Sequence, residues 1–302
     1  MKVLVTGGSG FIGRWVVAGL AAAGHGVRVF DLAPNRASLD DAVPGLADRV
    51  EIVSGDIADG SVRAAAEGCD GIVHLAGVMT VAAAADPIRA AQINLIGSLQ
   101  VFEAARALGI GRIVYVSTAG VFGPDDAVNP RPMTHYGAQK LAIEGAARAY
   151  HADHGLSSVG FRPYIVYGPG QSSGIAAGPS IAIAAAHRGE GAVIRFSGRV
   201  GFVHVGDVAA LMVAAVTSPM AGAQAYTLAG DTDEMVRFVS LLAEQVPGAQ
   251  TVIDGPPLRI PATLATSEMP APLGALPVTG LADGIARTLA HYRVRAAQGA
   301  GA

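Results

Sequence analysis

A short glycine-rich segment, TGGSGFIG at residues 6–13, separates a run of β-branched residues from a stretch with helical character. Gly7 permits a tight turn, Gly10 permits another group to approach the backbone closely, and Gly13 permits a helix to pack closely on a strand. A strand that turns this sharply into a helix is typical of a β-α-β unit with parallel strands. The segment therefore favours a parallel sheet covered by helices.

The rest of the chain repeats this alternation of strand and helix patterns. Short β-branched runs predict strands at residues 2–6, 27–31, 50–55, 71–76, 112–117 and 158–163. Ala-rich stretches predict helices at about residues 11–23, 60–67, 86–108 and 135–153. The pattern predicts an α/β protein with a Rossmann-like, doubly wound parallel sheet and a small C-terminal lobe.

The regular pattern breaks after residue 168 and then resumes in part. We expect a strand at 202–205, a helix from Asp207, a strand at 225–230, a helix to about Val246 and a last helix at 281–295. Residues 254–280 hold six prolines, which favours irregular structure there. We expect residues 1–168 to form a dinucleotide-binding core to which 202–230 return, and residues 169–201 and 231–302 to form a substrate-binding lobe.

Composition limits the partners of this chain. The net charge of −3, with scattered arginines, gives no basic patch for nucleic acid. Cys69 is the single cysteine, which excludes an internal disulfide and fits a reducing compartment, and the histidines show no metal-ligand spacing. No apolar run approaches the ~20 residues that cross a bilayer, and no signal peptide is evident at the start. We expect a cytoplasmic protein with a small-molecule partner and no metal, nucleic-acid or membrane partner.

The glycine turn and a carboxylate at the end of the second strand predict a dinucleotide site. Gly7, Gly10, Phe11, Ile12 and Gly13 would surround a pyrophosphate at the positive end of the first helix. Asp31 follows Gly13 by 18 residues, where a carboxylate can bind both ribose hydroxyls and repel a 2′-phosphate. This favours NAD over NADP, although Asp31 could also simply form a turn, and Arg14 and Arg36 lie near enough to accept a 2′-phosphate.

The segment HYGAQK, residues 135–140, places Lys140 four residues after Tyr136. Only Lys2 and Lys140 are lysines among 21 basic residues, so an ammonium is kept here in a chain that otherwise uses arginine. At this spacing on a helix the two side chains share a face, and a nearby positive charge lowers the cost of forming a phenolate. A surface tyrosine beside a solvated lysine is the alternative interpretation, and the glycine turn and Asp31 count against it.

These segments, in their order, resemble a known family. The chain resembles the extended short-chain dehydrogenase/reductase superfamily, also called the NAD-dependent epimerase/dehydratase family. The resemblance lies in TGGSGFIG, GDIAD (55–59), HLAG (74–77), Asn94, VSTAGVFG (116–123), YGAQK and RPYIVYGPG (162–170). The resemblance covers residues 1 to about 230 and implies NAD as cofactor and a homodimer built on a four-helix bundle.

The resemblance also implies roles for individual residues. Tyr136 would be the general acid/base, Lys140 would bind the nicotinamide ribose and tune Tyr136, and Thr118 would hydrogen-bond the reacting oxygen. Further contacts would come from four other segments: Asp56 and Ile57 beside the adenine, Leu75, Ala76 and Gly77 along the ribose and pyrophosphate, Asn94 in support of the active-site helix, and Pro163 and Tyr164 beside the nicotinamide.

Departures from the family pattern reduce the number of reactions that this chain could catalyse. Ala119 and Gly120 stand where the family's dehydratases and decarboxylases carry acidic residues, and Cys69 lies away from the site of the enolate-forming epimerases. Val200 occupies the position of the arginine with which sugar-nucleotide epimerases bind a diphosphate. We therefore expect an NAD-dependent dehydrogenase that acts on a secondary alcohol or lactol of a carbohydrate-like small molecule. A nucleotide-sugar epimerase similar to UDP-glucose 4-epimerase and an inactive dinucleotide-binding scaffold remain as alternatives.

Overall fold

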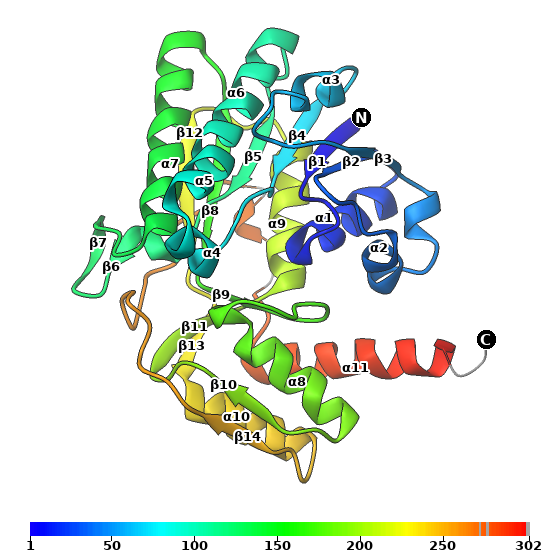
Figure 1. The fold of residues 1–302 in the computed structure, drawn as a ribbon, viewed down its shortest axis with the longest axis vertical. Helices are drawn as coiled ribbons and strands as arrows, with labels where there is room; N and C mark the ends of the chain where they lie inside the picture. The colour runs from blue at the N-terminus through cyan, green and yellow to red at the C-terminus, as the bar shows by residue number, and fades with distance from the viewer. Residues whose placement is uncertain (272, 276–277, 300–302) are drawn as a thin grey trace.

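The central feature of the computed structural model, which describes residues 1–271, 273–275 and 278–299, is a parallel sheet of seven strands (Figure 1). Its order is β12-β8-β5-β4-β1-β2-β3. The strands are β1 (Lys2–Thr6), β2 (Gly26–Asp31), β3 (Glu51–Ser54), β4 (Gly71–His74), β5 (Ile113–Val116), β8 (Ser158–Pro163) and β12 (Ala223–Leu228). The strand order reverses between β1 and β4, which confirms the predicted doubly wound, Rossmann-like topology.

Helices cover both faces of this sheet. One face carries α1 (Phe11–Ala22), α2 (Arg36–Ala42) and α9 (Val205–Thr217), and the other carries α3 (Val62–Ala66), α6 (Gly97–Leu108) and α7 (His135–His154). Side chains alternate between the two hydrophobic cores along a strand: Val3 and Val5 pack on the first face, whereas Leu4 packs on the second. Burial on both faces explains why these strands are almost entirely apolar in sequence.

A smaller lobe lies beside the carboxyl edge of the sheet (Figure 1). It contains a sheet of β13 (Asp231–Glu234), β11 (Arg199–His204) and β9 (Ile165–Tyr167), and a pair of strands, β10 (Ala192–Ile194) and β14 (Thr251–Ile253). Helices α8 (Gly178–Arg188), α10 (Met235–Gln245) and α11 (Leu281–Gly299) pack around them. The strand predicted at 202–205 is therefore longer and pairs with β9 and β13, while α9 and β12 return to the main sheet.

Short elements complete the chain between these. They are the 3₁₀ turns η1 (Leu46–Asp48), η3 (Ala119–Val121), η4 (Ile175–Ala177) and η5 (Leu273–Ala275), and the hairpin of β6 (Phe122–Gly123) and β7 (Asp126–Pro130). No helix within the described residues is both long and apolar enough to span a membrane.

Two predictions of secondary structure were wrong. The helix expected at 86–108 consists of α5 (Pro87–Ala91), a π-helical turn η2 (Gln92–Ile96) and α6, and it is preceded by α4 (Thr80–Ala85), which the sequence analysis missed. The strand expected at 71–76 ends at His74. The Leu75 amide still donates to the backbone carbonyl oxygen of Thr6, at 3.0 Å, but the Ala76 amide donates to the side-chain atom Thr6 Oγ1, at 3.3 Å, as the chain turns away from the sheet. The backbone after β4 is thereby free to line a cavity.

Candidate functional site

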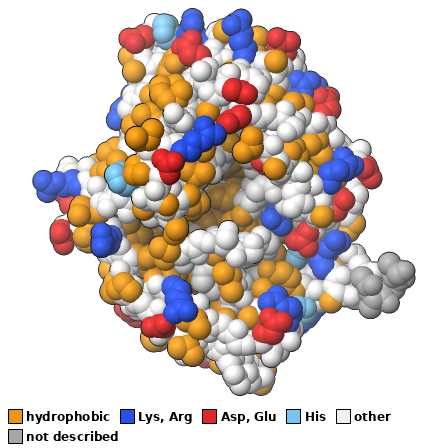
Figure 2. Space-filling view, viewed as in Figure 1, with side chains coloured by type: hydrophobic (Ala, Val, Ile, Leu, Met, Phe, Trp, Pro, Cys, Tyr) orange, Lys and Arg blue, Asp and Glu red, His pale blue; other side chains and the backbone are white. Residues whose placement is uncertain are grey.

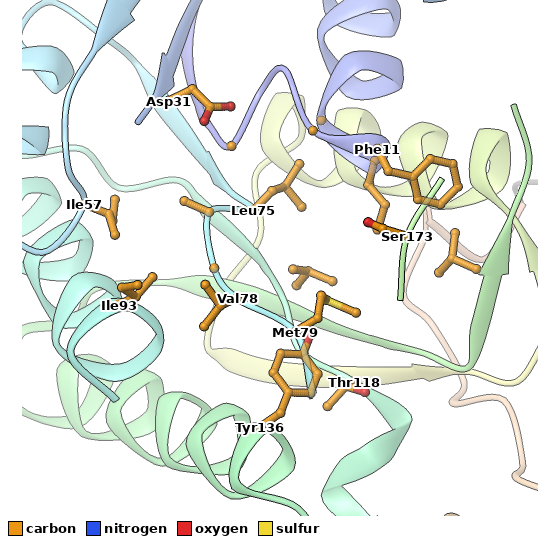
Figure 3. Close-up of a pocket in the computed structure, with 18 of the residues that line it drawn as sticks. Phe11, Asp31, Ile57, Leu75, Val78, Met79, Ile93, Thr118, Tyr136 and Ser173 are labelled. Atoms are coloured by element: carbon orange, nitrogen blue, oxygen red, sulfur yellow. The ribbon is translucent and has the colours of Figure 1, made fainter. Parts of the chain in front are cut away.

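A cavity of about 500 Å³ runs along the carboxyl ends of the strands β1, β2, β4, β5 and β8. Figure 3 shows Asp31, Ile57 and Ile93 at one end and Thr118, Tyr136 and Met79 at the other. This edge is where ligands bind in open α/β sheets, next to the point at which the strand order reverses. All of the residues expected to contact cofactor or substrate line this cavity, except Asn94.

The glycine turn leaves the start of α1 open to the cavity. Gly7 has a φ of +67°, and a Cβ atom there would lie 2.7 Å from the backbone nitrogen of Ala76. A Cβ atom on Gly13 would lie 2.1 Å from the carbonyl oxygen of Gly7, so the helix can only pack this closely without one. Helix α1 begins at Phe11 with no side-chain cap, so its first amides are free to donate to a ligand. A pyrophosphate fits this arrangement of open amides and positive helix dipole.

Asp31 lies at the end of β2 and is fixed by the glycine turn. Its Oδ2 atom accepts hydrogen bonds from the Ser9 hydroxyl, at 2.6 Å, and from the Ser9 amide, at 3.2 Å. Within the described chain its other oxygen has no protein donor and can accept from a ribose. Both cations that could hold a 2′-phosphate are engaged elsewhere, Arg36 with Asp48 and Arg14 with Asp41. The geometry at this end suits NAD.

The opposite end of the cavity brings Thr118, Tyr136 and Lys140 together. Lys140 Nζ donates to the carbonyl oxygen of Val116 at 2.9 Å and lies 5.8 Å from the centre of the Tyr136 ring. Burial lowers the pKa of Lys140 to about 8, and burial also raises the pKa of Tyr136. At neutral pH the lysine is therefore still mostly charged, while the tyrosine holds its proton and can donate it.

Thr118 lies where β5 gives way to the turn η3. Its hydroxyl oxygen accepts from the Gly120 amide at 3.0 Å, which leaves its proton free for a ligand. Helix α7 is capped in the same way, because the Thr134 hydroxyl accepts from the Gly137 amide at 3.0 Å. These two caps fix the backbone on either side of the cavity end.

The expected accessory residues divide into two groups. Those that line the cavity beside its adenosine and nicotinamide ends are Asp56, Ile57, Leu75, Ala76, Gly77, Pro163 and Tyr164. Asn94 instead lies fully buried in the π-helical turn, where its Oδ1 atom accepts from the Val78 amide at 2.8 Å. Its Nδ2 atom donates to Gln139 of α7 at 2.8 Å, so Asn94 connects the cavity wall to the helix of Tyr136 and Lys140.

Sequence analysis missed a buried ion pair beneath this helix. Glu144 is fully buried and accepts from Arg162 Nε at 2.8 Å and from the Ser117 hydroxyl at 2.5 Å. Ser117 and Arg162 each precede a cavity residue, Thr118 and Pro163 respectively. Glu144 therefore ties the ends of β5 and β8 to α7. The spacing of Tyr136, Lys140 and Glu144 at i, i+4 and i+8 is the signal that could have revealed it.

A second buried network connects β1 to the π-helical turn. The single hydroxyl proton of Ser98 goes to the carbonyl oxygen of Asn94 at 2.5 Å, so Ser98 accepts from His74 Nε2 at 2.8 Å. His74 Nδ1 then accepts from the Thr6 hydroxyl at 2.7 Å. Burial, with a smaller effect of the Lys140 charge, lowers the pKa of His74 to about 3. His74 is thus a neutral imidazole with one defined tautomer.

The loop after β9 closes the cavity, and it begins the segment 169–201 that the sequence analysis assigned to the substrate-binding lobe. Gly170, Gln171, Ser172, Ser173 and Ala176 line the cavity. The start of the loop is anchored by Trp15 Nε1, which donates to the Pro169 carbonyl oxygen at 3.2 Å, and by the Tyr292 hydroxyl, which accepts from the Gly170 amide at 3.2 Å. Only its richness in glycine and serine distinguished this segment in the sequence.

The sequence profile of the NAD dependent epimerase/dehydratase family matches residues 3–229. The chain belongs to this family. It is 30% identical to a UDP-glucose 4-epimerase of Mycolicibacterium smegmatis, over 97% of this chain and 99% of that protein. It is 34% identical to a 2-alkyl-3-oxoalkanoate reductase of Stenotrophomonas maltophilia, over 56% of this chain and about half (52%) of that one.

Solved structures of the family share this fold. The UDP-glucose 4-epimerase of Thermus thermophilus, crystallised with NAD, superimposes with a TM-score of 0.82 at 29% identity and covers 97% of this chain and 99% of its own. This epimerase/dehydratase family member is accordingly an NAD-dependent enzyme of the extended short-chain dehydrogenase/reductase type, as its sequence predicted. The open amides of α1 and the free oxygen of Asp31 are the features of this chain that fit NAD.

Proposed function

We propose that this enzyme is an oxidoreductase that transfers a hydride between NAD and a secondary hydroxyl, ketone or lactol carbon of a small molecule. The observation that carries the proposal is the meeting of Thr118, Tyr136 and Lys140 at one end of a cavity whose other end suits a dinucleotide. No acidic side chain stands beside Thr118, where Ala119 and Gly120 follow it, so the site offers no group for elimination or decarboxylation.

Bound NAD supplies the acceptor or donor of the hydride. The chain's own residues handle the substrate oxygen and its proton. The Thr118 hydroxyl donates to that oxygen and orients the reacting carbon. The Tyr136 hydroxyl gives the oxygen a proton in reduction, and the Tyr136 phenolate receives one in oxidation. The charge of Lys140, 5.8 Å from the ring of Tyr136, stabilises the phenolate that forms when this proton leaves.

A nucleotide-sugar epimerase is the second candidate. The similarity to UDP-glucose 4-epimerases along almost the whole chain supports it, because those enzymes are named for a nucleotide-sugar substrate. The lobe of this chain offers less support. Val200, at the position expected for a phosphate-binding arginine, is buried, and the neighbouring Arg199 donates to the carbonyl oxygen of Thr232. An inactive scaffold would have no use for the three catalytic side chains.

Substitution Tyr136→Phe tests the proposal. Turnover of the best substrate from a panel of secondary alcohols and sugars should fall by roughly 10²- to 10⁴-fold, with NAD affinity nearly unchanged, because only the transferred proton is lost. Tyr150→Phe is the matched control, since this hydroxyl on the same helix donates to Glu103 away from the cavity. Turnover of Tyr136→Phe within a few-fold of the parent would contradict the role.

A separate assay distinguishes the two candidates. An epimerase converts UDP-galactose to UDP-glucose with NAD retained and no net change in NADH absorbance. An oxidoreductase instead forms NADH in proportion to product. Efficient conversion of UDP-galactose without NADH formation would promote the second candidate over the first.

A further inference from the structure

Apolar side chains make up much of the described lining of the cavity, and Met79 is among them at the reacting end. Figure 3 shows Met79 beside Thr118 and Tyr136, with Phe11 and Ser173 across the cavity from them. Val78, Val166 and Ala176 also line the cavity. We propose that the substrate is an uncharged and mainly apolar secondary alcohol, or the matching ketone, in place of the carbohydrate-like molecule that the family resemblance implied. This inference rests on the proposed function and names the substrate class of the same site.

Positive charges at the cavity are already paired. Two arginines line its described walls, Arg14 and Arg89, and they form ion pairs with Asp41 at 3.3 Å and with Asp56 at 3.0 Å. A phosphate or carboxylate that enters such a cavity loses water and needs positioned cations in exchange. Lys140 is the remaining cation of the described lining. It donates one proton to the Val116 carbonyl oxygen, and the proposed function uses its charge to stabilise the phenolate of Tyr136. A charged substrate is therefore disfavoured.

The arginines of the lobe lie outside the described lining of the cavity, and three of them are paired with carboxylates. Arg188 pairs with Glu190, Arg195 pairs with Asp254 at 2.5 Å, and Arg237 pairs with Glu244 at 3.1 Å. None of the three belongs to the described lining of the cavity. The carboxylates that bind them would have to be displaced before any of these arginines could bind a diphosphate.

Few polar groups remain for additional hydroxyls of a substrate. The Tyr164 hydroxyl donates to the carbonyl oxygen of Pro261 at 2.5 Å, and Gln171 Oε1 accepts from the Ser180 hydroxyl at 2.7 Å. Thr118 and Tyr136 are needed by the reacting oxygen, which leaves chiefly the hydroxyls of Ser172 and Ser173 and the amide nitrogen of Gln171. A polyol would bury several hydroxyls against apolar walls without partners, and each of these costs free energy.

The entrance has the same character as the interior. Met79 lines the cavity and is still 53% exposed, and Ile175, in the loop that closes the cavity, is 43% exposed. Figure 2 shows hydrophobic side chains on the walls of the hollow at the centre of this face. Large apolar side chains at a solvent-facing rim favour a ligand that covers them.

The reaction balances without a further reagent. In oxidation, Tyr136 first releases its proton to solvent. Its phenolate then accepts the hydroxyl proton of the substrate, while the C–H bond of the carbinol carbon breaks and its electron pair reduces NAD⁺. One alcohol and one NAD⁺ give one ketone, one NADH and one proton. Reduction of the ketone is the reverse, with Tyr136 as the proton donor.

Cyclohexanol and myo-inositol form a matched pair of probes, because both are six-carbon rings and they differ in the number of hydroxyls. With NAD present and NADH absorbance as the measure, we expect kcat/KM for cyclohexanol to exceed that for myo-inositol by about 100-fold or more. Met79→Gln should lower the value for cyclohexanol by about 10-fold and leave NAD affinity unchanged, because it makes the apolar wall polar. Met133→Gln is the control, since Met133 is similarly exposed, at 57%, but does not line the cavity.

The outcomes separate the inference from the proposed function. Faster turnover of myo-inositol, galactose or UDP-glucose than of cyclohexanol overturns the inference and leaves the oxidoreductase proposal intact. Saturation-transfer NMR on the NAD-loaded enzyme reports binding directly, and failure of cyclohexanol to bind also overturns the inference. Binding of cyclohexanol but not of myo-inositol, without any turnover, supports the apolar class and counts against the proposed function instead.

Discussion

Substitution Glu144→Gln tests the buried ion pair between Glu144 of α7 and Arg162 of β8. The Glu144 side chain is 0% exposed and that of Arg162 is 16% exposed, so the guanidinium has little water to replace a lost partner. Glutamine keeps the size of the side chain but removes its charge and one of the acceptors that Arg162 and Ser117 share. The substitution therefore leaves a buried positive charge without its counter-charge.

Removal of one partner from a buried ion pair costs about 3–5 kcal/mol. In a chain of this size, each kcal/mol lowers Tm by roughly 2–4 °C, so we expect a decrease on the order of 10 °C. The double variant Glu144→Gln with Arg162→Met should recover part of the loss, because the uncompensated charge is then gone. The NAD-free protein is the right sample, since bound cofactor would mask part of the change.

Thermal unfolding followed by circular dichroism measures the single variants Glu144→Gln and Arg162→Met and the double variant. A decrease in Tm of less than about 2 °C for Glu144→Gln would refute the reasoning. So would a decrease in Tm for the double variant that equals the sum of the decreases for the two single variants. The first result would show that water or another group compensates Arg162. The second would show that the two side chains do not act as a pair.

Three further predictions follow from the same geometry. Asp31→Ala should narrow the preference for NAD over NADP, measured by titration of both cofactors, and equal affinities in the parent would mean that Asp31 does not set the choice. Burial lowers the pKa of Lys140 from 10.5 to about 8, so between these values the unfolded chain binds more protons and stability rises with pH. Denaturant unfolding gives the free energies of unfolding of Lys140→Met and of the parent. We expect the difference in favour of Lys140→Met to decrease by about 3 kcal/mol from pH 8 to pH 10.5, and a constant difference would contradict the burial of a charged lysine. Light scattering should give a homodimer of twice 30.4 kDa, because α7 carries exposed small residues such as Ala142 and Ala149, whereas the monomer mass would exclude it.

The sheet could be predicted because its strands carry their own signal. Val3, Leu4 and Val5 are all apolar since both faces of β1 are covered, and such runs are recognisable without knowledge of the partners. The break at η2 carries no comparable local signal. It coincides with Asn94, whose contacts with Val78 and Gln139 come from distant parts of the chain. A pattern of helical periodicity therefore predicts one continuous helix there.

In the candidate site, too, some residues could be predicted from local sequence and others could not. Motifs that directly follow a strand, such as the glycine turn and the HLAG segment, were placed at the cavity because parallel strands end at one edge of a sheet. Residues 169–201 were expected in the substrate-binding lobe, but the individual positions of Ser172 and Ser173 at the cavity were not foreseen. Met79 was not foreseen either, because it lies directly before α4, the helix that the sequence analysis missed. The apolar character of the cavity lining, on which the substrate class depends, is thus a tertiary property.

The hydrogen bonds through His74 join parts of the cofactor groove that are far apart in the chain. Thr6 precedes the glycine turn, and Asn94 supports the backbone of Val78 and the helix of Tyr136. Each donor in the series Thr6, His74, Ser98 has one acceptor, so all of these hydrogen bonds point the same way along the series. The two ends of the groove therefore keep a fixed separation. Ser98 lines neither end, yet it is the residue through which His74 and Asn94 are connected.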